Sequence, residues 1–257
     1  MSGQGQGQAG GGPGGWVARR FWTDAESAAD GGGGWQVLLD GRVLRTPGKQ
    51  SLRLPTAALA EAIAAEWQAQ GDLIRPETMP LTRAANSAIE RVAPQRAEVA
   101  MMLAAHAATD LLCYRATHPR DLAEAQARDW QPLLDWAAAH YGARLAVTAG
   151  IMPLPQDPGA LAALAGAVAG FGPFGLTALH DLVTLPGSLV LGLAVTEGRL
   201  TAADAHRLAR LDEDHQAALW GRDTEAEAAA EARLAAMRAA ETLWTLLAPA
   251  RGQGLVP

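Results

Sequence analysis

The hydrophobic period of the chain changes partway along, and this change limits the folds open to it. In the first part the period is two, so that Trp35, Val37 and Leu39 fall on one face of a strand. After about Leu81 the apolar residues recur with helical spacing instead. We therefore predict an α+β protein, with a small N-terminal antiparallel sheet and one packed helix, followed by a mostly α-helical C-terminal bundle.

A tight hairpin is the best-defined element of the first part. Asp40-Gly41 is the standard dipeptide for such a turn, because glycine accepts the positive φ that a primed turn requires. Thr56 is expected to cap a helix over residues 57–70, closed by Gly71. The strands that we expect beside this helix are residues 17–22, 35–40, 42–46 and 51–54.

The remainder of the chain is predicted to be helical, with one strand-like interruption at residues 144–148 that can return to the first sheet. Pro132 lies inside a predicted helix and should kink or break it. The helices are expected at residues 81–93, 95–109, 120–141, 160–169, 174–184, 188–196, 202–220 and 224–247. We divide the chain into a disordered glycine-rich leader (1–15), an N-terminal α/β domain (16–93) and a C-terminal helical domain (94–257).

Composition and charge exclude several classes of protein. The formal net charge is −6, which argues against a nucleic-acid partner, since such proteins carry a basic footprint. The longest apolar run, residues 175–195, contains His180 and Asp181, so we expect a buried helix pair and no stable membrane insertion. Cys113 is the only cysteine, so no internal disulfide can form. A cytoplasmic protein is the expectation.

The segment 210–221 concentrates the polar groups that could carry a function. On a helix, Glu213, Gln216 and Trp220 fall on one stripe, while Leu211 and Leu219 are expected to face the core. A carboxylate, an amide and an indole on one face suit a catalytic corner, a metal corner or a docking surface.

Catalytic and cofactor sites have weaker support in the sequence. Asp212, Glu213 and His215 could belong to a metal-dependent or small-molecule enzyme, which stays open as an alternative. A di-iron bundle, however, needs a second Glu-x-x-His pair, and the sequence has none that we can find. The glycine run 31–34 precedes a strand, whereas a phosphate loop follows one. We therefore expect no cofactor and no metal.

A series of short motifs, in order and over some two hundred residues, resembles a known family. The motifs are Arg19-Arg-Phe-Trp22, Leu39-Asp-Gly-Arg42, Leu44-Arg-Thr-Pro47, Lys49, Leu54-Pro55, Leu59-Ala60, Glu66-Trp67, Pro80-Leu-Thr82, Asn86, Asp110-Leu-Leu-Cys-Tyr114, Trp130-x-Pro132, Trp136, Arg210-Leu-Asp-Glu213, Gln216 and Trp220-Gly221. The pattern is similar to that of the ATP synthase assembly chaperones that bind the alpha subunit of the catalytic head. Since the leader lacks the arginines of a transit peptide, the chain resembles a bacterial member.

This resemblance implies a two-domain fold, no catalysis, and an unassembled alpha subunit as the partner, whose apolar interface is shielded until the beta subunit replaces the chaperone. It places an important acidic residue at Glu213, although neighbouring Asp212 and Asp214 blur the assignment. The resemblance gives Trp67 a structural role, beside Asp40 and Gly41 of the hairpin. A general holdase without client preference remains a further alternative.

Overall fold

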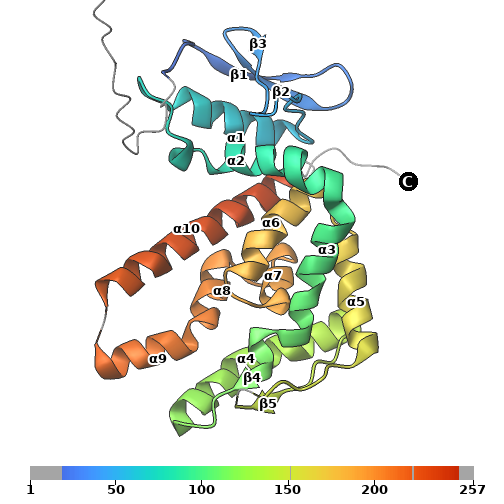
Figure 1. Ribbon diagram of the computed structural model, residues 1–257, viewed down its shortest axis with the longest axis vertical. Helices are drawn as coiled ribbons and strands as arrows, with labels where there is room; N and C mark the ends of the chain where they lie inside the picture. Colours follow the sequence, from blue (N-terminus) through green and yellow to red (C-terminus); the bar gives the residue numbers. More distant parts are fainter. Residues whose placement is uncertain (1–18, 151, 222, 249–257) are drawn as a thin grey trace, which may run out of the picture.

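The computed structural model describes residues 19–150, 152–221 and 223–248; the expected leader lies outside these ranges. A small antiparallel sheet in the order β1-β2-β3 stands at one end of a body of helices (Figure 1). Its strands are β1 (Ala25–Ala29), β2 (Trp35–Leu39) and β3 (Arg42–Val43). The predicted α+β class, with the sheet first and the helices after it, is confirmed.

The α-helices continue the chain from this sheet to the C-terminal end of the described residues. Their bounds are α1 (Ala57–Gln68), α2 (Pro80–Ser87), α3 (Arg96–Ala104), α4 (Arg120–Tyr141), α5 (Pro158–Ala169), α6 (Pro173–Thr184), α7 (Leu189–Thr196), α8 (Ala202–Ala209), α9 (Leu211–Trp220) and α10 (Thr224–Leu247). A π-helical turn, η2 (Ala88–Val92), extends α2, and short 3₁₀ segments lie at η1 (Pro76–Thr78), η3 (Ala93–Gln95), η4 (Ala105–Thr109) and η5 (Leu111–Cys113). None of the helices described is long and apolar enough to cross a bilayer.

The β2–β3 hairpin turns at Asp40 and Gly41, as predicted. Their φ angles of 47° and 75° are both positive, which is the requirement of a type I′ turn. The Asp40 carboxylate also accepts hydrogen bonds from the backbone N–H groups of Thr23 and Asp24, at 3.0 and 2.9 Å. These donors hold the pKa of Asp40 below its usual range and tie the hairpin to the chain that enters β1.

The first strand was placed wrongly by sequence pattern. Within the predicted strand 17–22, the described part makes only an isolated bridge, Arg19 to Leu73, and the strand beside β2 is Ala25–Ala29. This segment is rich in alanine and has no β-branched or aromatic residue, so its strand state depends on pairing with β2. The predicted return strands are also shorter: β3 ends at Val43, and Ser51 and Leu54 make single bridges.

Helix α1 packs against the sheet and supplies the core of this end of the molecule. Thr56 caps it by accepting the N–H of Leu59 at 3.3 Å, as expected. Leu59 and Ile63 are fully buried beneath β2. This core also includes Leu243 of α10, so the last helix of the chain closes the N-terminal core. The proposed division at residue 93 stays a prediction.

Two predicted elements in the helical part were wrong. The strand at 144–148 reduces to β5 (Thr148–Ala149), which pairs in parallel with β4 (Tyr114–Arg115) as a separate two-stranded sheet. The single helix predicted over 202–220 is broken at Arg210, where φ is −103° and ψ is 11°. The carbonyl of Leu208 accepts the indole N–H of Trp130 at 2.9 Å, a tertiary contact that competes with a continuous helix. Helix α4, in contrast, runs unbroken past Pro132.

Helices α6 and α7 form the centre of the larger core. All of α7 except Thr196 is buried, and its first turn is capped by Ser188, whose hydroxyl accepts the N–H of Leu191 at 3.0 Å. The buried Asp110 carboxylate accepts from the Ser188 hydroxyl at 2.7 Å and from the N–H of Val190 at 3.0 Å. Burial raises the pKa of Asp110 to about 6.

Candidate functional site

Helix α9, which carries the predicted stripe, lies at the surface, at the lower left in Figure 1, and follows α8 and precedes α10 in the chain. It begins after Arg210 and ends at Gly221, whose φ of 94° and ψ of 163° belong to a region open essentially to glycine. None of its residues is buried. The expectation that Leu219 faces the core is wrong, because this side chain is 62% exposed. Leu211 does pack against the larger core, although it is only partly buried.

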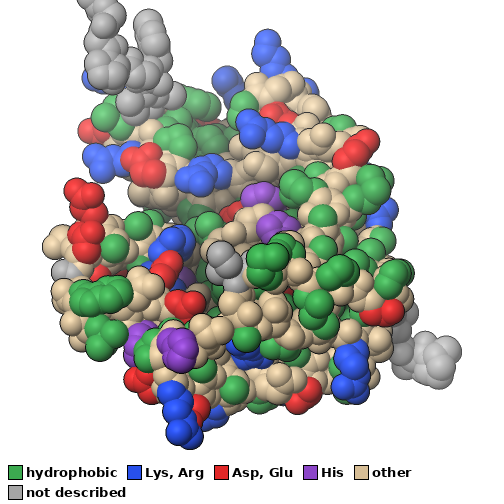
Figure 2. Space-filling model, turned by 60° about the horizontal axis from the view of Figure 1, so that its bottom comes forward, with side chains coloured by type: hydrophobic (Ala, Val, Ile, Leu, Met, Phe, Trp, Pro, Cys, Tyr) green, Lys and Arg blue, Asp and Glu red, His purple; other side chains and the backbone are tan. Residues whose placement is uncertain are grey.

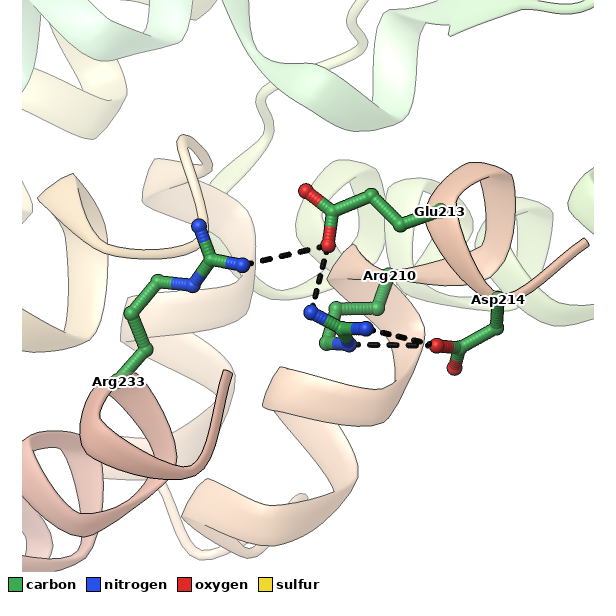
Figure 3. Close-up of polar contacts among 4 residues, drawn as sticks. All are labelled: Arg210, Glu213, Asp214 and Arg233. Carbon is green, nitrogen blue, oxygen red and sulfur yellow. Dashed lines mark hydrogen bonds and ion pairs between the residues drawn. The ribbon is translucent and has the colours of Figure 1, made fainter. Parts of the chain in front are cut away.

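Glu213 lies between two arginines, Arg210 at the junction of α8 and α9 and Arg233 of α10 (Figure 3). Its Oε2 is 2.7 Å from Arg210 Nη1 and 3.4 Å from Arg233 Nη2, and Arg233 belongs to α10. Asp214 Oδ1 in turn lies 3.0 Å from Arg210 Nη2. The Glu213 side chain is nevertheless half-exposed, so it links α9 to α10 while one side of its carboxylate remains open to solvent.

Asp212 faces inward and joins α9 to α4. Its carboxylate accepts a hydrogen bond from the side-chain amide of Gln126, which is completely buried. The amide oxygen of Gln126 accepts the backbone N–H of Ala116 at 2.7 Å. Because the Gln126 amide is used on both sides, this contact fixes the position of Asp212 against α4, away from the exposed stripe.

His215 also faces α4, in a contact separate from that of Asp212. Its Nδ1 is 4.0 Å from Asp121 Oδ2, and its buried Nε2 has no hydrogen-bond partner among the described residues. In the part of the chain that the structure describes, no three His, Cys, Asp or Glu side chains are grouped so that they could hold a metal ion. The predicted corner of Asp212, Glu213 and His215 therefore divides into contacts with two different helices.

The other two stripe residues, Gln216 and Trp220, are exposed. Seven residues of helix separate Glu213 from Trp220 by about 10 Å along the axis, so the carboxylate and the indole form two separate points on one stripe. Trp220 is 79% exposed and stands beside the exposed Leu219 at the end of α9. Figure 2 shows hydrophobic side chains at the left of this face, over the α9–α10 end, with charged side chains close by.

The remaining motif residues lie in the N-terminal core. Trp67 is partly buried and packs against Trp22, with ring centroids 5.0 Å apart. Its neighbour Glu66 accepts the backbone N–H groups of Leu81 and Thr82 at 2.7 and 2.8 Å, and so caps the start of α2. The Glu-Trp motif thus joins α1 to α2 and fills the core.

Other candidate side chains take up structural positions. Cys113 is buried, and burial raises the pKa of its thiol to about 12, as expected for an inert thiol. His180 and Asp181, adjacent on α6, contact each other: Nδ1 lies 2.8 Å from Oδ1, and the hydrogen bond with Asp181 raises the pKa of the imidazole.

Arg233, Gln126 and Asp121 are contact residues of α9 that sequence pattern could not identify. They are separated from their partners on α9 by 20 or more positions in the sequence, and only the tertiary fold brings them into contact. Arg210 had a local signal, since it precedes Glu213 by three residues and Asp214 by four, the spacing of ion pairs on a helix.

Comparison with known proteins places this chain among chaperones. A family model described as ATP12 chaperone protein matches residues 19–138. The structure is similar to Atp12 from Paracoccus denitrificans, with 60% identity and a TM-score of 0.88 over 90% of this chain and 99% of that one. A mutant of Atp12p from the same organism matches equally well, over 98% of its chain. A putative chaperone from Agrobacterium tumefaciens is 40% identical, with a TM-score of 0.87 over 90% of this chain and 87% of its own.

These similarities define the class as a chaperone with a small sheet followed by helices. The chain belongs to the ATP12 chaperone family, as a bacterial member. The family expected from the motif series is therefore confirmed.

Proposed function

We propose that the chain is a non-enzymatic chaperone for assembly of the F-type ATP synthase. It binds the unassembled alpha subunit of the catalytic head and shields the apolar interface of that subunit until the beta subunit takes its place. Membership of the ATP12 chaperone family supports a chaperone role. The motif series from Arg19 to Gly221 supports the alpha subunit as the client.

The exposed indole of Trp220 is the observation that carries the proposed binding surface. An unassembled subunit exposes apolar surface that would otherwise self-associate, and a chaperone must offer an apolar patch in return. Trp220 and Leu219 offer such a patch at the end of α9, at 79% and 62% exposure. A tryptophan with a polar surround is a frequent anchor of protein interfaces.

Glu213 and Gln216 give this patch its polar part. Glu213 is anchored by Arg210 and Arg233, so its carboxylate is held in one place with little further loss of side-chain entropy on binding. An exposed acidic group of this kind steers a basic region of the client and sets its orientation. Asp212 is expected to act indirectly, by fixing α9 on α4.

The test is capture of purified alpha subunit by the tagged full-length chain, with beta subunit added afterwards. We expect capture by the wild type and release by the beta subunit. Trp220→Ala should weaken capture by about tenfold or more, in line with loss of an aromatic anchor. Glu213→Lys should slow association, since it reverses a steering charge.

Matched variants separate binding from folding. Phe21→Ala removes another exposed aromatic side chain, 70% exposed, and Glu61→Lys reverses an exposed charge on α1. Both should capture the alpha subunit as the wild type does, and the melting curves of Trp220→Ala, Phe21→Ala and Glu61→Lys should match that of the wild type. Glu213→Lys also loses the ion pairs with Arg210 and Arg233, so its capture is measured at a temperature at which its melting curve shows it folded. Unchanged capture by Trp220→Ala and Glu213→Lys would remove α9 from the binding surface. Failure of the wild type to capture would overturn the client.

Two further measurements address the alternatives. A general holdase would suppress aggregation of unrelated proteins as strongly as that of the alpha subunit. A metal-dependent enzyme would carry close to one metal ion per chain, which elemental analysis of the purified protein detects.

A further inference from the structure

A shallow hollow of about 480 Å³ lies between α4, the turn after α7, and α8. Three arginines line it, and each comes from a different segment: Arg128 from α4, Arg199 from the turn and Arg207 from α8. Between them, apolar surface comes from the exposed Pro132 and the partly exposed Leu200, while Leu133 and Leu208 are buried. Convergence of three cations on one hollow is unexpected in a chain whose formal net charge is −6.

The arginines of this hollow are incompletely neutralised. Arg128 is paired, since its Nε and Nη2 lie 2.9 and 3.0 Å from the carboxylate oxygens of Asp129. Arg207 is only 3.9 Å from Asp204, whose other oxygen accepts the hydroxyl of Thr201 in the capping box of α8. Two carboxylates, those of Asp129 and Asp204, therefore lie near three arginines, and the Asp204 carboxylate also accepts a hydrogen bond from Thr201.

Arg199 has no carboxylate partner among the described residues. Its guanidinium lies over the ring of Trp136, 5.7 Å from the centroid. The nearest acid along the chain, Glu197, is 3.4 Å from the hydroxyl of Tyr141. The Trp136 ring orients the Arg199 guanidinium while its N–H groups remain available, a preorganised donor for an anion.

Some other arginines of the protein, in contrast, do lie close to carboxylates. Arg210 meets two carboxylates, and Arg53 lies 2.7 Å from Asp30. Because like charges repel, leaving three arginines around one hollow costs free energy that a bound anion would recover. Guanidinium groups match carboxylates through paired N–H donors, whereas a bare ion would leave the apolar surface of Pro132 and Leu200 in contact with water.

We infer that the hollow between α4 and α8 binds an acidic segment of a partner protein, in which carboxylates flank an apolar side chain. The carboxylates pair with Arg199 and Arg207, and the apolar side chain covers Pro132 and Leu200. The inference does not depend on which client α9 binds. A membrane surface fits less well, because lipid-binding sites use a larger cluster of basic residues than these three.

The probe is a fluorescein-labelled peptide with two glutamates on each side of a leucine, followed by anisotropy with the full-length chain. We expect saturable binding that weakens with added salt. A matched peptide with glutamine in place of glutamate should bind at least about tenfold more weakly, because two charge-assisted pairs are lost. The double variant Arg199→Glu with Arg207→Glu should weaken binding of the acidic peptide to the same extent.

The control is a second double variant, Arg83→Glu with Arg91→Glu, which changes net charge equally at exposed positions on α2 and η2. It should bind the acidic peptide as the wild type does. If the first double variant unfolds, Arg199→Gln with Arg207→Gln replaces it.

Several results would overturn the inference. Absence of binding by the acidic peptide, or equal binding of the two peptides, would remove the charge recognition. Equal weakening by the control variant would reduce it to an effect of net charge. Displacement of the peptide by inorganic phosphate at the same concentration of anionic groups would make the hollow a free-anion site, and preferential binding of anionic phosphatidylserine vesicles would make it a membrane contact.

Discussion

Helices α7 and α9 are of similar length but are held in opposite ways. Of the eight residues of α7, seven are buried, and α6 and α4 cover it. Of the ten residues of α9, none is buried. Apart from Leu211, which packs at the edge of the larger core, its contacts with other helices are polar, such as those of Asp212 with Gln126 and of Glu213 with Arg233. The larger core thus reaches α9 at its first residue, Leu211, while the apolar side chains of Leu219 and Trp220 at the other end are exposed.

The difference shows how one chain can combine a stable body with an adaptable surface. Burial of apolar side chains contributes about 1.5–3 kcal/mol for each large residue, whereas an exposed ion pair contributes about 0–1 kcal/mol. Local opening free energies are therefore expected to be low for α9 and close to global for α7. A low opening free energy in the helix that contacts the client would favour release of the client, which a chaperone requires.

Truncation of a leucine in each region should give the largest contrast. Leu179 of α6 is fully buried in the core around α7, so Leu179→Ala should lower the free energy of unfolding by about 2–5 kcal/mol. Leu219→Ala on α9 should change it by less than about 0.5 kcal/mol. Urea unfolding followed by circular dichroism measures both. Equal losses would mean that α9 is part of the cooperative core.

Loss of the buried cap on α7 should have the next largest effect. Asp110 accepts from Ser188, Val190 and Leu112, so Asp110→Asn places an amide N–H₂ against a donor and should cost about 1–3 kcal/mol. Asp72→Asn, at an exposed position, is the matched control and should be neutral. An unchanged urea midpoint for Asp110→Asn would show that the cap is dispensable.

The same carboxylate should give stability a distinctive pH dependence. Burial raises the pKa of Asp110 from 3.8 to about 6, so the folded state binds this proton more tightly than the unfolded chain. Its contribution is complete below about pH 4 and is lost as the pH rises to about 6. The difference in unfolding free energy between wild type and Asp110→Asn should therefore shrink over this window. A constant difference would contradict the raised pKa.

The sequence predicted the self-contained elements well. Both long helices, Arg120–Tyr141 and Thr224–Leu247, have the predicted bounds, because Gly142 with its φ of 71° ends the first and Asp223 caps the second. The turn at Asp40-Gly41 was recognised for the same reason: its conformation is decided by the residues in it.

Elements decided by distant partners were missed. Strand β1 exists through its pairing with β2, and the break at Arg210 coincides with the Trp130 contact to Leu208, 78 residues away in sequence. Of the candidate site, the exposed stripe of Glu213, Gln216 and Trp220 follows from helical spacing. The inward turn of Asp212 and the approach of Arg233 depend on how α9 meets α4 and α10, which spacing does not encode.

The variant with the smallest expected effect on stability is also the most direct test of whether α9 opens separately from the core. Arg233→Met keeps most of the side-chain volume and removes the only ion pair that joins Glu213 to α10 among the described residues. Since the pair is partly exposed, the free energy of unfolding should change by about 1 kcal/mol or less. Hydrogen exchange should nevertheless quicken at the amides of α9 and stay unchanged in α6 and α7. Arg120→Met, which breaks an ion pair within α4, is the control and should leave α9 unaffected. Faster exchange in α7, or unchanged exchange in α9, would show that the α9–α10 contact is not what holds α9 in place.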